Sequence, residues 1–108
     1  MKKFKIEYFG KTYDVYPHID KYTCNDTLAI RLMCCDTYEP FCNITVNLPY
    51  YTDKIKQLGF EYQFVDINEL PNVIDFIIDN KLGFITKYVG FSGYCEYPLI
   101  KFDLKEFI

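Results

Sequence analysis

Alternating apolar and polar positions predict β-strands along most of this chain. Charged residues alternate with apolar ones from Phe4 to Tyr8, and a short return strand from Tyr13 to Tyr16 follows Gly10-Lys11. Successive side chains of a strand point to opposite faces, so this alternation is typical of strands with one buried face. The sequence therefore predicts an N-terminal hairpin. The polar segment 17–26 that follows predicts a loop.

The clearest alternation lies in the middle of the chain, where two strands flank a turn at 36–40. Their apolar positions are Leu28, Ile30, Leu32 and Cys34 in the first strand and Cys42, Ile44, Val46 and Leu48 in the second. The register that sets Cys34 opposite Cys42 gives every one of these residues an apolar partner. A slip of one residue would place them against polar side chains, so we predict a second hairpin in that register.

An apolar stripe of helical period follows later in the chain. Its positions are Leu70, Val73, Ile74, Ile77 and Ile78, which recur at i, i+3, i+4, i+7 and i+8. This spacing predicts one main helix over about 69–81. Asn68 is its expected N-cap, Pro71 falls in its first turn and Gly83 lies past its end.

The remaining segments complete the expected architecture. Residues 52–59 predict a single helical turn, and strands are expected at 60–65, 84–89 and 97–104. Mostly antiparallel strands with one late helix indicate the α+β class. We predict one domain over residues 1–108, with an antiparallel sheet of about five to seven strands and the helix packed on one face.

Composition narrows the class of protein. Of the 108 residues, 50% are hydrophobic and 19% aromatic, with 11 Tyr, 10 Phe and no Trp, which excludes intrinsic disorder. No apolar run is long enough to cross a membrane, and no signal peptide is visible. Lys, Ile, Asn and Tyr are abundant, as in AT-rich bacterial and phage genomes. We therefore expect a protein of the bacterial cytoplasm that makes no membrane contact.

The charge pattern argues against direct nucleic-acid binding. The net charge is −3, Arg31 is the only arginine, and acidic and basic residues are interspersed. Nucleic-acid binders usually carry a basic patch that contains arginine. Binding through lysines stays open as an alternative function, with these candidates: Lys2, Lys3, Lys5, Lys54 and Lys56.

Neither a metal site nor a cofactor is indicated. The five cysteines form no Cys-x-x-Cys motif, and adjacent Cys34 and Cys35 would point to opposite faces of a strand. An odd number of cysteines without a secretory signal favours reduced thiols that pack as small apolar residues.

Catalytic candidates are few. Nucleophilic catalysis would need the single serine, Ser92, or Cys95 to meet the single histidine, His18. No nucleophile elbow surrounds Ser92, and no glycine-rich phosphate loop is present. We expect a protein that is not an enzyme, and a small enzyme remains the alternative.

Aromatic and acidic residues outside the expected sheet interior are the candidates for a binding surface. Tyrosine is enriched in the cores of protein interfaces, although part of this content fills a core without tryptophan. The acidic candidates could engage a basic nucleic-acid channel on a partner protein, and otherwise they simply face water. The candidate protein-binding residues are Tyr38, Glu39, Tyr50, Tyr51, Asp53, Asp75, Asp79 and Tyr94.

Three stretches between Thr27 and Asp103 resemble a family of short bacterial proteins of unknown function. The first is Thr27–Leu32 with Glu39–Phe41 and Ile44–Leu48, and the second is Phe64–Asp66 with the helix and Asn80–Gly83. The third and most specific is Ser92-Gly-Tyr-Cys-Glu-Tyr-Pro-Leu99. Members of this family occur on phages, plasmids and conjugative elements. The resemblance implies an accessory protein of a mobile genetic element. Such proteins are often inhibitors of host defence, including anti-CRISPR proteins that bind a defence nuclease complex.

Overall fold

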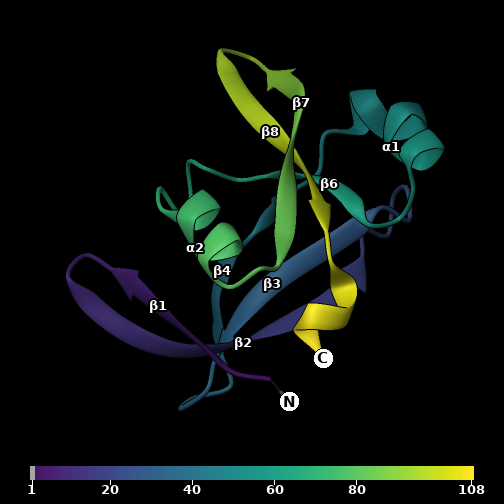
Figure 1. Cartoon of the computed structure of the whole chain (residues 1–108). Helices are drawn as coiled ribbons and strands as arrows, with labels where there is room; N and C mark the ends of the chain where they lie inside the picture. Colours follow the sequence, from purple (N-terminus) through teal and green to yellow (C-terminus); the bar gives the residue numbers. More distant parts are fainter. Residues whose placement is uncertain (1) are drawn as a thin grey trace.

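A computed structural model describes residues 2–108 and contains two four-stranded antiparallel sheets (Figure 1). The first sheet has the order β1-β2-β3-β4, formed by β1 (Phe4–Tyr8), β2 (Lys11–Lys21), β3 (Leu28–Cys34) and β4 (Pro40–Asn43). The second has the order β5-β6-β8-β7, formed by β5 (Thr45–Val46), β6 (Tyr62–Val65), β8 (Cys95–Phe102) and β7 (Gly83–Ser92). The helices are α1 (Thr52–Leu58) and α2 (Val73–Asp79), with 3-10 turns η1 (Pro49–Tyr51) and η2 (Leu104–Phe107). The α+β antiparallel class is confirmed, with eight strands divided between two sheets.

Strand β2 is longer than the sequence suggests, because it continues through the segment expected to be a loop. Pro17 lies opposite Leu32 of β3, and Ile19 lies opposite Ile30. The last residue of β2 that pairs with β1 is Val15, opposite Phe4. From Pro17 onward β2 therefore pairs only with β3 and has a free edge on its other side. A proline is tolerated at an edge, where its missing N–H group leaves no ladder bond unmade.

The second hairpin forms, but the predicted register is wrong. Cys42 lies opposite Leu32, while Cys34 lies opposite Val15 of β2. Beyond Ile44 the chain leaves the first sheet and enters the second as β5. Thr45 is buried at this crossing, and its Oγ1 accepts a hydrogen bond from the Ile30 amide at 3.0 Å. This side-chain bond replaces the ladder bond that a continuous strand would have made.

Helix α2 is shorter than the expected 69–81. The Asp66 carboxylate accepts bonds from the amides of Asn68 and Glu69, which closes a separate turn before the helix. At the other end, Lys81 has a φ of 58°, and the Leu82 amide bonds to the Ile77 carbonyl at 2.8 Å. This left-handed C-terminal cap ends the helix before Gly83.

Two apolar clusters form the interior. The larger one joins the first sheet to α2 and β8, with Phe4 edge-on to Phe76 at 6.0 Å. The smaller one lies under α1 and contains Leu48, Ile55, Phe64 and Leu99. Buried Gln63 links the sheets, because its Nε2 donates to the Leu28 carbonyl of β3 at 2.9 Å. Within residues 2–108, none of the helices has the length and apolar character that crossing a membrane requires.

Candidate protein-binding surface

The fold distributes the candidate binding residues over four places. Tyr38 and Glu39 lie in the β3–β4 connection, which is at the end of the molecule opposite the β7–β8 tip (Figure 1). Tyr50 and Tyr51 lie in η1, and Asp53 lies in the first turn of α1. Asp75 and Asp79 are exposed on α2, and Tyr94 is fully exposed at the tip of the β7–β8 hairpin. They therefore do not form a single patch.

Tyr51 connects one of these groups to the hairpin. Its ring packs against Phe64 with centroids 5.2 Å apart, and its hydroxyl oxygen accepts the Phe91 amide at 3.0 Å. Tyr50 beside it is almost fully exposed, and its ring stands edge-on to that of Tyr51 at 5.3 Å. Tyr51 thus holds the hairpin in place, whereas the Tyr50 ring is presented to solvent. Asp53 is exposed in the first turn of α1.

Strand β7 of the β7–β8 hairpin carries apolar side chains on an open face. Ile85, Val89 and Phe91 lie opposite Ile100, Pro98 and Glu96 of β8, so the three share one face of the sheet. Their exposures are 52%, 45% and 54%. We call these three residues the hairpin face. Figure 1 shows the tip of this hairpin projecting beyond the body of the molecule. Val89 and Phe91 lie beyond the part of β8 that pairs with β6, whereas Ile85 lies opposite Ile100, which also pairs with β6.

Close packing on the opposite side fixes the hairpin. A Cβ atom added to Gly90 would lie 2.7 Å from the Phe64 ring and 2.8 Å from Leu48. Such distances leave no room for a side chain, so the hairpin backbone lies directly on the cluster under α1. The hairpin face is therefore held rigidly. The opposite side of the hairpin is the one that is buried against this cluster.

The free edge of β7 is protected against pairing with another strand. The register shifts between Ile85 and Val89, and within this bulge the Thr86 hydroxyl donates to the Leu99 carbonyl at 2.7 Å. Lys87 adds a charge at the same place, and the Phe91 amide donates its hydrogen bond to the Tyr51 hydroxyl oxygen. Bulges, lysines and covered amides are the usual means by which edge strands avoid pairing. A partner can therefore contact the hairpin through its side chains, but not by pairing a strand with the backbone of β7.

An open groove continues the hairpin face toward α2. It has a volume of about 550 Å³ and is lined by Ile78 and Ile85, and by Phe84, whose side chain belongs to the other face of edge strand β7. Three charged residues, Lys81, Asp103 and Glu106, also line it. Ile78 and Phe84 are themselves largely exposed, at 48% and 67%. Exposed apolar side chains that adjoin one another, rather than single scattered ones, are typical of interaction surfaces.

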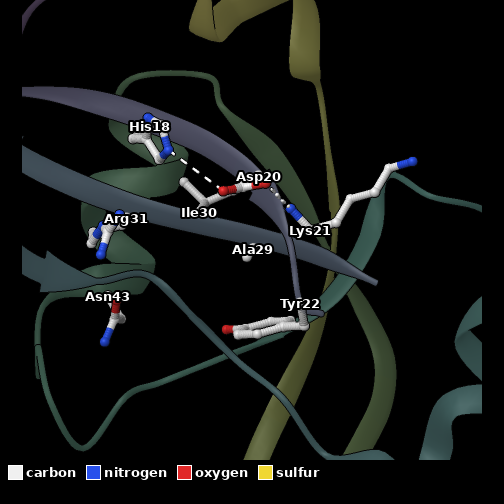
Figure 2. A pocket seen from close by; sticks show the side chains of 8 residues that line it. All are labelled: His18, Asp20, Lys21, Tyr22, Ala29, Ile30, Arg31 and Asn43. Atoms are coloured by element: carbon white, nitrogen blue, oxygen red, sulfur yellow. Dashed lines mark hydrogen bonds and ion pairs between the residues drawn. The ribbon is translucent and has the colours of Figure 1, made fainter. Parts of the chain in front are cut away.

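The open face of the first sheet has a different chemistry. Figure 2 shows His18, Asp20, Arg31 and Asn43 around Ala29, which forms the floor of a hollow of about 190 Å³. His18 Nε2 lies 3.7 Å from an Asp20 carboxylate oxygen. No carboxylate within residues 2–108 lies at ion-pair distance from Arg31. These polar groups face water, as expected for the outer face of an antiparallel sheet.

The acidic pair on α2 lies beside β1. Asp75 and Asp79 line a shallow hollow that also includes Lys5. The Lys5 ammonium instead bonds Asp14 at 2.9 Å, and this bond raises the lysine pKa. In the described part of the chain, neither helix carboxylate has an ion-pair partner.

The candidate nucleophiles and the histidine lie in different sheets. Ser92 and Cys95 are paired at the tip of the β7–β8 hairpin, while His18 lies on β2 of the first sheet. Burial, followed by the influence of Glu69 and Asp66, raises the pKa of the Cys42 thiol to about 12, so this thiol stays protonated at neutral pH. Among residues 2–108, no group of His, Cys, Asp and Glu side chains gathers in a way that could hold a metal ion.

The sequence-based candidates omit the residues of the hairpin face. The bulge interrupts the alternation of apolar and polar residues between Ile85 and Val89. The sequence pattern alone therefore does not indicate that Ile85, Val89 and Phe91 share a face, which follows from the strand register. Phe9 was also omitted. It is 89% exposed at the β1–β2 turn with a φ of 51°, which is unusual for a bulky residue.

The comparisons with known proteins identify a family and no activity. A family model described as a domain of unknown function, DUF4313, matches residues 17–107. The match begins within β2 and includes the whole second sheet with both helices. Neither the curated proteins nor the solved structures yield a match.

Proposed function

The chain belongs to the family defined by the domain of unknown function DUF4313, and we propose that it is a non-enzymatic protein that acts by binding another folded protein. The observation that supports this proposal is the hairpin face. Three apolar side chains on one projecting hairpin remain about half exposed, although the same hairpin is closely packed on its other side. Burial of this surface by a partner would be favourable by about 25 cal/mol for each Å² of apolar area.

The partner binds through side-chain contacts and not by adding a strand. The bulge at Thr86 and the hydrogen bond from the Phe91 amide to Tyr51 leave the β7 edge without a regular row of free backbone groups. Phe91 and Tyr94 supply aromatic anchors of the kind that dominate binding energy in protein interfaces. The exposed acidic residues Asp75 and Asp79 are candidates for secondary contacts, since they lie on α2 and not on the hairpin.

The most specific form of the proposal concerns the partner's identity. The resemblance to proteins of phages and plasmids supports a role in the bacterial cytoplasm as an inhibitor of a host-defence complex, such as a CRISPR nuclease. Expression in cells with an active CRISPR system should then restore plaque formation by a targeted phage. If interference is unchanged with every defence type tested, the proposal of host-defence inhibition is rejected. The more general proposal of protein binding is then retained.

The binding proposal is tested by comparing two exposed phenylalanines. A tagged chain is purified from the cells that carry its gene, as wild type, as Phe91→Ser and as Phe9→Ser. We expect a partner in stoichiometric amount with the wild type and with Phe9→Ser, and loss of that partner with Phe91→Ser. Retention by all three chains, or no partner with the wild type, would contradict the proposal.

A further inference from the structure

Lysines lie over aromatic rings on the side of the second sheet that α1 partly covers. Tyr62, Lys101 and Phe84 form a row across β6, β8 and β7, because each is paired with the next in the strand register. Lys101 Nζ lies 5.9 Å from the centre of the Tyr62 ring. The Phe84 ring at the end of the row is 67% exposed. Tyr62 packs partly against the cluster under α1, so Lys101 and Phe84 form the open part of this row.

Two further lysine–ring pairs involve rings that are close in the chain to members of this row. Lys54 of α1 lies 5.0 Å from the centre of the Tyr88 ring, and Lys21, at the end of β2, lies 5.6 Å from that of Phe60. Tyr88 and Phe60 are both more than one-third exposed. We call the three pairs together with Phe84 the lysine–aromatic face. Its members are Lys21, Lys54, Lys101, Phe60, Tyr62, Phe84 and Tyr88.

The charge of these lysines is not neutralised by the protein. In the described part of the chain, the ion pairs of lysines involve only Lys2 and Lys5, which lie in the first sheet or next to it. Carboxylates near the face are Glu61, whose side chain lies against Gly59, and Asp26, which lines a small hollow with Phe60. Asp103 and Glu106 line a groove with Phe84. Lys21, Lys54 and Lys101 thus have no ion-pair partner within residues 2–108, on a chain whose net charge is −3.

We propose that the lysine–aromatic face binds single-stranded nucleic acid. Phosphate groups attract the unpaired ammonium groups, and the exposed rings provide surfaces on which bases stack. When a base takes the place over a ring, the lysine moves from the ring to the neighbouring phosphate. An acidic protein segment would satisfy the lysines, but its carboxylates would leave the rings without a partner. The repeated pairing of a cation with a ring favours nucleic acid.

The fold changes what the charge pattern alone indicates. Lys21, Lys54 and Lys101 are far apart in the sequence, where they look like parts of a mixed surface. Strand pairing sets Lys101 between Tyr62 and Phe84, and the fold places Lys54 over the Tyr88 ring and Lys21 over the Phe60 ring. The absence of arginine there predicts binding without base-specific readout, because lysine offers a point charge instead of a planar fork.

Fluorescence anisotropy with a labelled oligo(dT) tests this proposal, with an oligo(rU) arm that compares DNA with RNA. The wild type is compared with Lys21→Gln/Lys101→Gln and with a matched control, Lys11→Gln. The control removes a lysine that lies 5.3 Å from the Tyr13 ring on the first sheet. We expect the double variant to bind at least about tenfold more weakly at low salt. The slope of log affinity against log salt should fall by about 1.4, since each contact to a single strand contributes about 0.7.

The substitution Phe84→Leu separates stacking from charge. It should weaken binding by about tenfold, in the range typical of a base–ring stack, without changing the salt slope. Folding of each variant is verified by circular dichroism. The proposal is overturned by absent binding at low salt, by an equal loss in Lys11→Gln, or by polyglutamate that displaces the oligonucleotide at equal charge concentration. The last result would assign the face to an acidic protein instead.

Discussion

The open face of the first sheet and the hairpin face are both solvent-facing β surfaces, but they differ in chemistry. Around Ala29 the first sheet presents His18, Asp20, Arg31 and Asn43. The outer part of the second sheet presents Ile85, Val89 and Phe91. Polar outward positions are the default for an antiparallel sheet with one buried face. The hairpin departs from that default, and the departure indicates a surface that is completed by a partner.

Thiol reactivity should give the largest difference between the two regions. Cys95 is exposed on the hairpin, whereas Cys42 is buried in the first sheet with its pKa raised to about 12 by burial. At pH 8, iodoacetamide should therefore modify Cys42 at least about a hundredfold more slowly than Cys95, since only a thiolate reacts. Peptide mass spectrometry over time measures both rates. Similar rates for the two thiols would show that β4 opens readily.

The substitution Gly90→Val should break the hairpin's attachment. A side chain has no room between Phe64 and Leu48, and overpacking of this kind typically costs about 1–3 kcal/mol in the free energy of unfolding. Val89→Ala is the control, because it alters the adjacent residue on the open face and should change stability by less than about 0.5 kcal/mol. Urea unfolding of both variants measures the difference. Equal midpoints would show that the hairpin is not packed on this cluster.

The substitution Tyr51→Phe should loosen the hairpin edge with a smaller effect. It removes the acceptor of the Phe91 amide, a loss of about 1 kcal/mol for a typical hydrogen bond. Hydrogen exchange at the Phe91 amide, followed by NMR, should become faster in this variant. Tyr50→Phe is the matched control, because no hydrogen bond of the exposed Tyr50 hydroxyl is found in residues 2–108. Unchanged exchange in Tyr51→Phe would mean that the edge is protected by another group.

Arg31→Ala should produce the smallest effect. The side chain is exposed and has no ion-pair partner in the described residues, so the free energy of unfolding should change by less than about 0.5 kcal/mol. Partner binding should also be unchanged. A large loss of partner binding at unchanged stability would transfer the functional role from the hairpin to the first sheet.

Much of the fold is predictable from local patterns. The α+β class, the strand pairs at 4–16 and the face of each central strand follow from periodicity alone. The register of β3 with β4 does not, because it depends on a bulge after Leu32 and on the Thr45 side chain bonding to the Ile30 amide. Helix length also depends on a side-chain bond, in which Asp66 closes a turn before α2. Hydrogen bonds from side chains to the backbone leave no periodic signal, whether the two residues are distant or close in the chain.

The candidate surface is harder to predict than the fold. Tyr94 was expected from its position near a turn, and the structure places it at the hairpin tip. Tyr51 was expected at a partner interface, yet its ring packs on Phe64 and its hydroxyl holds β7. The apolar side chains at 85, 89 and 91 look like core residues in the sequence. Val89 and Phe91 lie on the part of the hairpin that extends beyond β6, whereas Ile85 lies within the paired sheet on edge strand β7.

Site-specific photo-cross-linking in living cells tests the central comparison most directly. The photoreactive residue p-benzoyl-phenylalanine replaces either Phe91 on the hairpin face or Arg31 on the first sheet, in cells that carry the gene. We predict a covalent adduct of one defined mass from position 91 and none from position 31. Adducts from position 31 alone, or from neither position, would contradict the proposal that the hairpin face binds a protein partner.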